Sequence, residues 1–465
     1  MYMFYWLLQT DMGTTQIVLY ELVVLTMGIL SVILFIRRMK GGRYLAKGWQ
    51  YPNVIESHKK SLQKRGMPLD FASLLSTHYK SNNEENSTES EILVQKARKL
   101  YEEAFDADFT STKSLGCLME YTEAKRPLTY DEVATINRIH DSYCMLDPIV
   151  GLPAPQFPID PTNFKAPDWL EKMENLVRLG LFLFHANNQI HQEEKSAHLV
   201  AIISTVLDHY YQVPLAKVYR FANDANKSLL ELLFGHLMNA VSEGKLSAAS
   251  GLMAAESIVK MRSPFEAFPA AFVQQIEVIL ALPQSSEALI RAGYDPERIR
   301  KATLIAEISD EKAKNLAQVY IGYDYATKEE TTKLTKGLDI LNRLEQISRW
   351  QGEVQAKFDD LYYVLPSAYA LRVRQYLTLE TRRRMCVTMM RILLALQNNN
   401  DWKLAIALDG ASFDPYTGSN FELEVNEQIV SVRAFCPDFF RKSEGTLYRP
   451  ITLTVQTHNL FSNNP

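Results

Sequence analysis

The stretch FDPYTGSNFELEV, residues 413 to 425, is where the pattern of the chain changes from helix to strand. Pro415 fixes its own φ, Asp414 can accept a hydrogen bond from a nearby backbone N–H, and Gly418 permits a positive φ. These three residues predict a structural turn that leads into a strand. Such a turn needs no ligand.

The residues after this turn alternate between apolar and polar side chains, which is the pattern of a strand with one buried face. The alternation covers FELEV at 421–425 and QIVSVRAF at 428–435, on either side of Asn426. ITLTVQ at 451–456 is a candidate for a third strand. Residues 401–465 are therefore predicted to form a small C-terminal antiparallel β-hairpin cap.

Most of the chain between residue 49 and this cap has helical spacing of its apolar residues. Between residues 168 and 400 the predicted helices follow one another through short loops without a fixed repeat period, which favours an antiparallel helical bundle or an irregular α-solenoid. The fold class is therefore predicted to be mainly α. The predicted helices cover 91–105, 129–144, 168–187, 192–211, 226–242, 246–261, 268–282, 310–320, 328–361 and 367–397.

Residues 148–167 hold six of the nineteen prolines. Because each proline removes a backbone donor and fixes φ, we expect an extended connector at a domain boundary, with a polyproline ligand for an SH3-like partner as the alternative. The predicted organisation is an N-terminal tail (1–16), a transmembrane helix (17–36), a juxtamembrane helical region (37–147), the proline-rich connector (148–167), a helical domain (168–400) and the cap (401–465).

The stretch IVLYELVVLTMGILSVILFI, residues 17–36, has the length of a helix that crosses a bilayer and contains one charge, Glu21. No small-residue cleavage site follows it, so we interpret it as a permanent single-pass anchor. The positive-inside rule predicts that the N-terminus lies outside and that the large domain is cytoplasmic. The cations predicted to contact membrane lipids are Arg37, Arg38, Lys40, Arg43 and Lys47.

The formal net charge is −4, so no overall positive field indicates nucleic acid as a partner. Arg382, Arg383 and Arg384 have no interleaved aromatic residues, and we interpret them as a solvated helix face.

The four cysteines lie far apart without a CxxC pair, which argues against a zinc site or a disulfide framework. Phosphate-loop, dinucleotide-binding, HExxH and GxSxG signatures are missing, so no cofactor is predicted.

The best candidate site lies in HANNQIHQEEKSAH, residues 185 to 198, which is rich in histidine. On one continuous helix, His191 and His198 fall on one stripe with Glu194 beside them, and imidazole and carboxylate are common ligands of transition metals. His191 and His198 are about 10 Å apart along such a helix, so a third element would have to complete the site. A polar helix face is the alternative.

The C-terminal pattern resembles a group of uncharacterised membrane-anchored helical proteins of planctomycetes and related bacteria. RRRMCVTMMRILLALQ at 382–397, DPYTG at 414–418 and FELEVNEQIVSVRAF at 421–435 carry the likeness. The resemblance implies one N-terminal membrane helix and a helical body, and it leaves the opposite membrane topology open. The turn and hairpin are also similar to the tail of the major pseudopilin of type II secretion, and ELVVLTMGIL at 21–30 resembles a pseudopilin N-terminal helix.

These patterns favour a membrane-anchored helical protein that acts as an interaction or scaffold module, with lipids and other proteins as its partners. No catalytic activity is evident from the sequence. Two alternatives stay open: a membrane-bound metal-dependent enzyme that uses His191, Glu194 and His198, and a pseudopilin-like assembly component.

Overall fold

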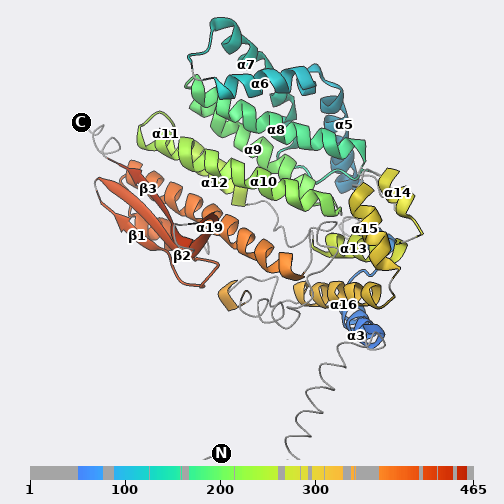
Figure 1. Ribbon diagram of the computed structural model, residues 1–465. Helices are drawn as coiled ribbons and strands as arrows, with labels where there is room; N and C mark the ends of the chain where they lie inside the picture. The colour runs from blue at the N-terminus through green and yellow to red at the C-terminus, as the bar shows by residue number, and fades with distance from the viewer. Residues whose placement is uncertain are drawn as a thin grey trace, which may run out of the picture.

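The computed structural model describes most of the chain between residues 51 and 457 (Figure 1). The described residues are mainly helical with one small antiparallel sheet, which confirms the predicted fold class at this level. They are 51–76, 88–124, 126–157, 159, 167–213, 215–259, 268–282, 284–291, 296–307, 309–327, 337–339, 341, 366–407, 412–426, 428–442 and 448–457.

The helices before the proline-rich stretch are α3 (Tyr51–Lys64), α5 (Thr88–Asp106), α6 (Thr112–Glu123) and α7 (Tyr130–Tyr143), with 3₁₀ turns η2 (Asp108–Thr110) and η3 (Cys144–Ile149). The later helices are α8 (Asp168–Gln189), α9 (Glu193–Tyr211), α10 (Ala216–Leu232), α11 (Met238–Ser242), α12 (Ala248–Val259), α13 (Phe268–Ala281), α14 (Ser286–Arg291), α15 (Pro296–Ala306), α16 (Ser309–Ala326), α19 (Pro366–Gln397) and α20 (Trp402–Ala407). The strands are β1 (Glu422–Val425), β2 (Ile429–Lys442) and β3 (Tyr448–Gln456).

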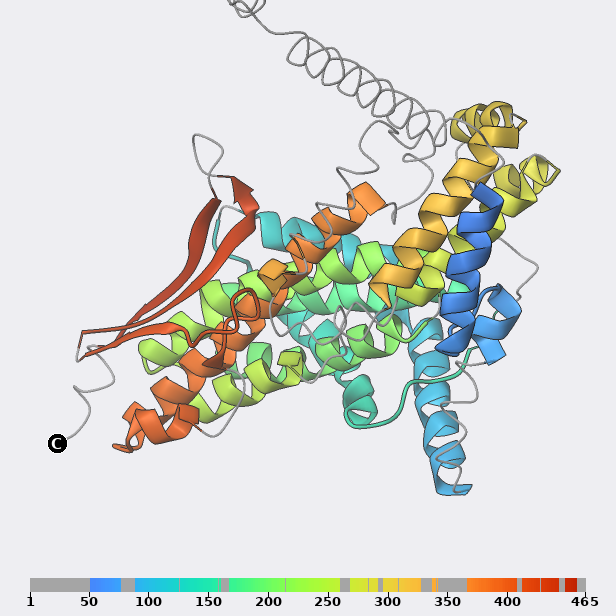
Figure 2. The same cartoon turned by 90° about the horizontal axis from the view of Figure 1, so that it is seen from below.

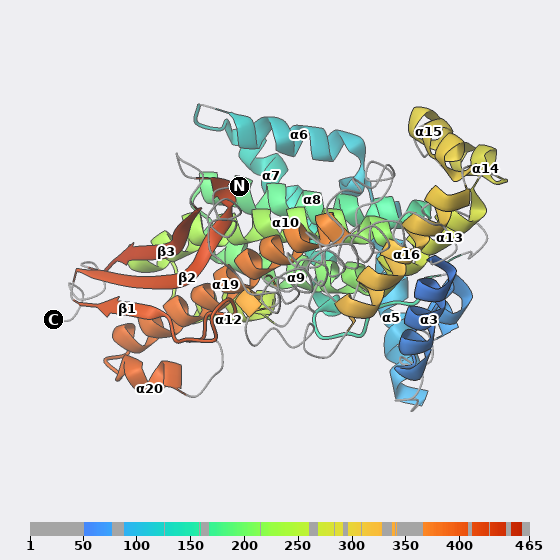
Figure 3. The same cartoon turned by 60° about the horizontal axis from the view of Figure 1, so that its bottom comes forward.

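The helices pack in an order that leads from the N-terminal helices to the sheet. α6 and α7 contact α8, α8 contacts α9, α9 contacts α12, and α12 contacts α19. α19 has 32 residues and is therefore about 48 Å long. It crosses the body and contacts β2, so it joins the helical part to the sheet (Figure 2). α14 and α15 lie at the end of the molecule away from the sheet (Figure 3).

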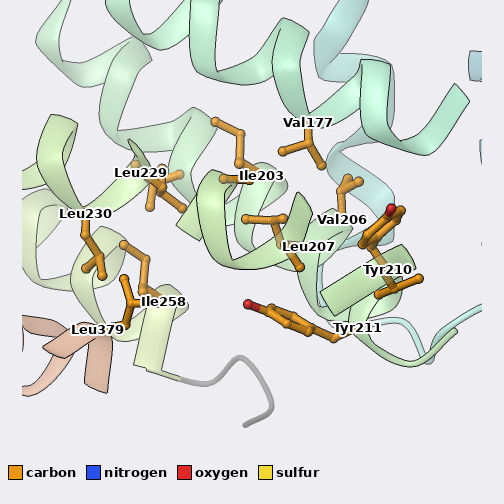
Figure 4. Packing of buried hydrophobic residues seen from close by; sticks show 14 of the residues in the cluster. Val177, Ile203, Val206, Leu207, Tyr210, Tyr211, Leu229, Leu230, Ile258 and Leu379 are labelled. Atoms are coloured by element: carbon orange, nitrogen blue, oxygen red, sulfur yellow. The ribbon is translucent and has the colours of Figure 1, made fainter. Parts of the chain in front are cut away.

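The helices on both sides of the proline-rich stretch share one hydrophobic core. The cluster of buried residues runs from Leu62 to Val455, and its centre is made by α8, α9, α10, α12 and α19 (Figure 4). The described part of the connector joins this core, because Phe157 is buried and stacks on Trp169 with ring centroids 4.6 Å apart. His209 Nε2 also donates to the Leu152 carbonyl oxygen at 2.9 Å.

The described strands form an antiparallel sheet in the order β1-β2-β3. Glu422 lies opposite Arg433 between β1 and β2, and Val430 lies opposite Val455 between β2 and β3. The third strand expected at 451–456 is therefore confirmed, and it begins at Tyr448. Alternate residues of β2 from Val430 to Cys436 are buried, which is why one face of the sheet packs on α19.

α3 is held against α16 by a cluster of polar side chains around Asp324, which is almost fully buried. His58 Nδ1 lies 2.8 Å from Asp324 Oδ2, Ser61 Oγ donates to Asp324 Oδ1 at 2.7 Å, and Arg65 forms an ion pair with the same carboxylate. His58 and Ser61 on α3 and Arg65, which directly follows α3, thus converge on one carboxylate of α16. This contact connects segments that lie far apart in the sequence.

The predicted helix at 226–242 is longer and less regular in the structure. α10 begins at Ala216, and the chain then passes through one π-helical turn, η4 (Leu233–Leu237), before α11. α3, α6, α14, α15 and α20 were not among the predicted helices. Of the predicted helix at 328–361, only 337–339 and 341 are described, and 337–339 is helical.

None of the described helices is both long enough and apolar enough to cross a bilayer. The predicted anchor at 17–36 lies outside the described residues, as do the predicted lipid-contacting cations.

Candidate functional site

A corner with three kinds of metal-binding side chain forms where α7 passes into η3. Pro148 has no N–H to donate and stands in η3, and the chain there follows a 3₁₀ path. In a 3₁₀ helix, side chains three residues apart eclipse each other, so Cys144 and Asp147 lie on the same side of η3. Both side chains are half-buried.

His198 completes this corner from the second turn of α9, which packs against η3. Its Nε2 lies 3.5 Å from Asp147 Oδ1. One ligand atom from each of Cys144, Asp147 and His198 can be chosen so that all three lie within 4.8 Å of one another. The imidazole is half-exposed, so the corner opens to solvent on the α9 side.

Burial disfavours charge on the groups of this corner. Burial raises the pKa of Cys144 to about 11, and the negative charges of Asp147 and Asp141 add to the effect. Burial also raises the pKa of Asp147, against the opposing influence of His198. A thiol with so high a pKa is protonated at neutral pH and is a poor nucleophile. Metal binding at this corner requires the thiol and the carboxyl group to lose their protons, and a bound cation stabilises both the thiolate and the carboxylate.

A buried polar pair lies directly behind the corner. His140, in the last turn of α7, has its Nε2 3.5 Å from Cys144 Sγ, and its Nδ1 lies 3.1 Å from Asn187 Nδ2 on α8. Burial, together with the nearby charge of Lys195, lowers the pKa of His140 to about 4. His140 is therefore neutral at pH 7, which is the form that binds metals.

The structure places the three residues of the sequence-predicted stripe, His191, Glu194 and His198, with different partners. His191 lies in the turn between α8 and α9 with φ 56°, since α9 begins at Glu193, and its side chain is exposed. Glu194 is exposed, and its Oε1 accepts from the Ser247 backbone N–H at 3.4 Å. His198 instead shares its ligand group with two residues of η3. The sequence prediction missed Cys144 and Asp147.

The turn residues of the opening stretch lie at the junction between α19 and the sheet. Asp414 is fully buried, and its carboxylate accepts from the backbone N–H groups of Tyr416 at 2.8 Å and of Phe435 and Cys436 at 2.7 Å each. Pro415 accepts from the Gly337 N–H through its carbonyl oxygen. Gly418 has φ +75°. Three backbone donors thus satisfy the carboxylate within the protein.

The arginine cluster of α19 corrects one sequence interpretation. Arg382 and Arg383 are 4% and 3% exposed and therefore do not form a solvated face. Arg382 makes an ion pair with Asp438 of β2 at 2.7 Å and with Glu231 of α10 at 3.6 Å. These residues line a pocket of about 740 Å³ between η4, α19 and β3. Arg383 and Arg384 pair with Glu380 of the same helix, whereas the acidic partners of Arg382 are supplied by other elements and are not revealed by its sequence neighbourhood.

Three comparisons were made, and no protein-family model, no curated protein and no solved structure matched this chain.

Proposed function

We propose that this protein binds a divalent transition-metal ion of the zinc class at the corner made by η3 and α9. The observation that carries the proposal is the convergence of a thiol, a carboxylate and an imidazole, whose ligand atoms lie within 4.8 Å of one another. Thiolate and imidazole together select zinc-like ions over magnesium and calcium, which prefer oxygen ligands.

The spacing of the donors supports this proposal. Metal–ligand bonds of about 2.0–2.3 Å in a tetrahedral site place neighbouring ligand atoms about 3.3–3.8 Å apart. The separation between His198 Nε2 and Asp147 Oδ1, 3.5 Å, already has this value. Asp147 Oδ1 is buried and accepts no hydrogen bond from the described residues. It therefore has an acceptor position that a cation can occupy without displacing a hydrogen bond.

A metal at this corner would link two parts of the fold. η3 continues directly from α7, whereas His198 stands on a central helix of the body. Binding stabilises the folded state because the ligand set is assembled only there, and a metal at 100 times its dissociation constant contributes about 2.7 kcal/mol. The proposed role is thus to bind an ion and to fix the N-terminal helices on the body.

The experiment loads the purified full-length protein with Zn²⁺, removes unbound metal and measures bound zinc by elemental analysis and affinity by calorimetric titration. We expect one zinc per chain in the wild type and strongly weakened binding in Cys144→Ser, Asp147→Asn and His198→Gln. His191→Gln and Glu194→Gln are the matched controls, because both side chains are exposed. Wild-type levels of zinc in Cys144→Ser, combined with loss in His191→Gln, would refute this site in favour of the sequence-predicted stripe.

A second candidate function is the interaction or scaffold module expected from the sequence. The exposed face of α7 favours it, because a hollow of about 670 Å³ follows that face from Tyr130, which is 86% exposed, to Ser142. The lining residues are spaced three and four apart, as on one side of a helix. Cross-linking at Tyr130, after replacing it with a photoreactive aromatic residue, tests this idea. Absence of any protein adduct in intact cells would count against it.

We also propose that the chain is anchored at a bacterial inner membrane through 17–36, with the helical body on the cytoplasmic side and the following cations near lipid headgroups. The apolar length of 17–36 and the cations that follow it support this arrangement. Protease added outside intact spheroplasts should leave a tag after residue 465 intact. Digestion of the tag would place the body on the opposite side.

A further inference from the structure

We infer that His140 is the fourth ligand of the metal site, and that Asn187 holds its ring in the binding orientation. This inference rests on the proposed function and adds one residue from α7 and one from α8. It assigns a closed, four-coordinate site of one thiolate, one carboxylate and two imidazoles.

The position of His140 supports a role as ligand. Its Nε2 lies 3.5 Å from Cys144 Sγ, which is the separation expected for two donors on one tetrahedral ion. The other two donors, His198 Nε2 and Asp147 Oδ1, are also 3.5 Å apart. The four residues therefore form two correctly spaced pairs. The group whose ligand atoms lie within 4.8 Å of one another does not include His140, so coordination of one ion by all four residues requires the side chains of the two pairs to move together on binding.

Asn187 provides the second, independent observation. Its side chain is fully buried, its Nδ2 lies 3.1 Å from His140 Nδ1, and its Oδ1 has no hydrogen-bond partner among the described residues. A half-turn of this amide exchanges the two atoms, so that Oδ1 accepts from Nδ1–H of His140. The lone pair of His140 then resides on Nε2 and faces Cys144. A metal-binding histidine commonly donates its other N–H to such an oxygen.

A closed set of ligands decides what the ion can do. Four protein donors leave no position for water or substrate, which is the arrangement of structural zinc sites. Three donors would leave one open position, as in catalytic zinc sites. The inferred site therefore fixes α7, η3 and α9 relative to one another and does not activate water. His140 is 5% exposed, whereas the side chains of His198 and Asp147 are 51% and 43% exposed, so solvent approaches the site from the side of His198 and Asp147.

The test uses Co²⁺ as a spectroscopic substitute for zinc in the full-length protein. We expect intense visible absorption from four-coordinate cobalt and a thiolate charge-transfer band in the wild type. His140→Gln should lower the affinity and convert the spectrum to that of a site with bound water. Asn187→Leu should weaken binding roughly 10- to 100-fold, which is the usual effect of losing an outer hydrogen bond. Asn187→Asp, which keeps an oxygen at His140 Nδ1, should restore binding.

The outcomes separate this inference from the proposed function. Absence of cobalt from the wild type would overturn both. Stoichiometric cobalt in the wild type, with an unchanged spectrum and affinity in His140→Gln, would overturn the fourth ligand alone and leave an open three-ligand site. If His140→Gln does not fold, as judged by far-ultraviolet circular dichroism, the comparison of Asn187→Leu with Asn187→Asp decides. Equal affinities of those two variants would refute the role of Asn187 and His140.

Discussion

Replacing Asp414 with asparagine should loosen the attachment of the sheet to the helical body. An amide keeps one oxygen where the carboxylate has two, and in the better orientation this oxygen still accepts from Phe435 and Cys436. The N–H of Tyr416 then faces an NH₂ group and is left unpaired in the interior, which costs about 1–3 kcal/mol. The two remaining bonds change from charge-assisted to neutral and lose roughly 1 kcal/mol each.

The expected loss is therefore about 3–5 kcal/mol. Burial raises the pKa of Asp414, and the three backbone donors act in the opposite direction. Replacing the carboxylate with a neutral amide also removes part of the free-energy cost of burying a charge. We therefore expect a loss of stability near the lower limit of this range.

Hydrogen–deuterium exchange measures this effect locally, since β2 pairs its backbone with both neighbouring strands. Amides of residues 429–442 should exchange much faster in Asp414→Asn than in the wild type, while those of α5 should not change. Asp401→Asn is the matched control, because that exposed carboxylate accepts only the Lys403 N–H among the described hydrogen bonds at this position. Equal exchange of 429–442 in Asp414→Asn and the wild type would refute the assignment of this stability to the carboxylate.

Three further predictions concern packing and charge. A methyl group in Gly180→Ala would lie 2.5 Å from the Tyr143 hydroxyl, so the variant should lose about 1–3 kcal/mol in urea unfolding, and a gain in stability would contradict the packing. Burial tends to raise the pKa of Asp324, but the hydrogen bonds from Ser61 and His58 and the positive charge of Arg65 outweigh this and hold its pKa below the usual value. The contribution of the ionised Asp324 to folding stability is fully present above about pH 4 and is lost as pH falls through the folded pKa. The difference in unfolding free energy between the wild type and Asp324→Asn should therefore shrink between pH 7 and pH 3. A difference that stays constant over this range would disprove this. Asp438→Asn removes one partner of buried Arg382 and should cost about 3 kcal/mol in the same assay, whereas an unchanged midpoint would show that the remaining partner suffices.

Local patterns predicted the regular elements well because these elements have one apolar face. The helix predicted at 168–187 is α8, which ends two residues later, and the alternation at 421–435 is the β1–β2 hairpin. The irregular turn at Leu233–Leu237 was not predicted. A single π-helical turn changes the number of residues per turn only locally. Because the apolar residues on either side keep helical spacing, the sequence pattern does not reveal the turn.

The candidate site depends on contacts between distant segments, and this limits what a sequence pattern can reveal. His198 was identified because histidines cluster near it. Its partners on η3 were not, because only the packing of α9 on η3 brings Cys144 and Asp147 to it. The one local signal is the spacing of three between these two residues just before Pro148. His191 was included wrongly in a helix, because α9 starts two residues after it.

The contact between α3 and α16 has a consequence for biosynthesis. His58 leaves the ribosome 266 residues before its partner Asp324. At translation rates of about 5–20 residues per second, the side of α3 that packs on α16 stays uncovered for roughly 13 to 53 seconds before α16 is synthesised. A nascent chain of this protein therefore exposes that surface for more than half of its synthesis, until α16 has been made.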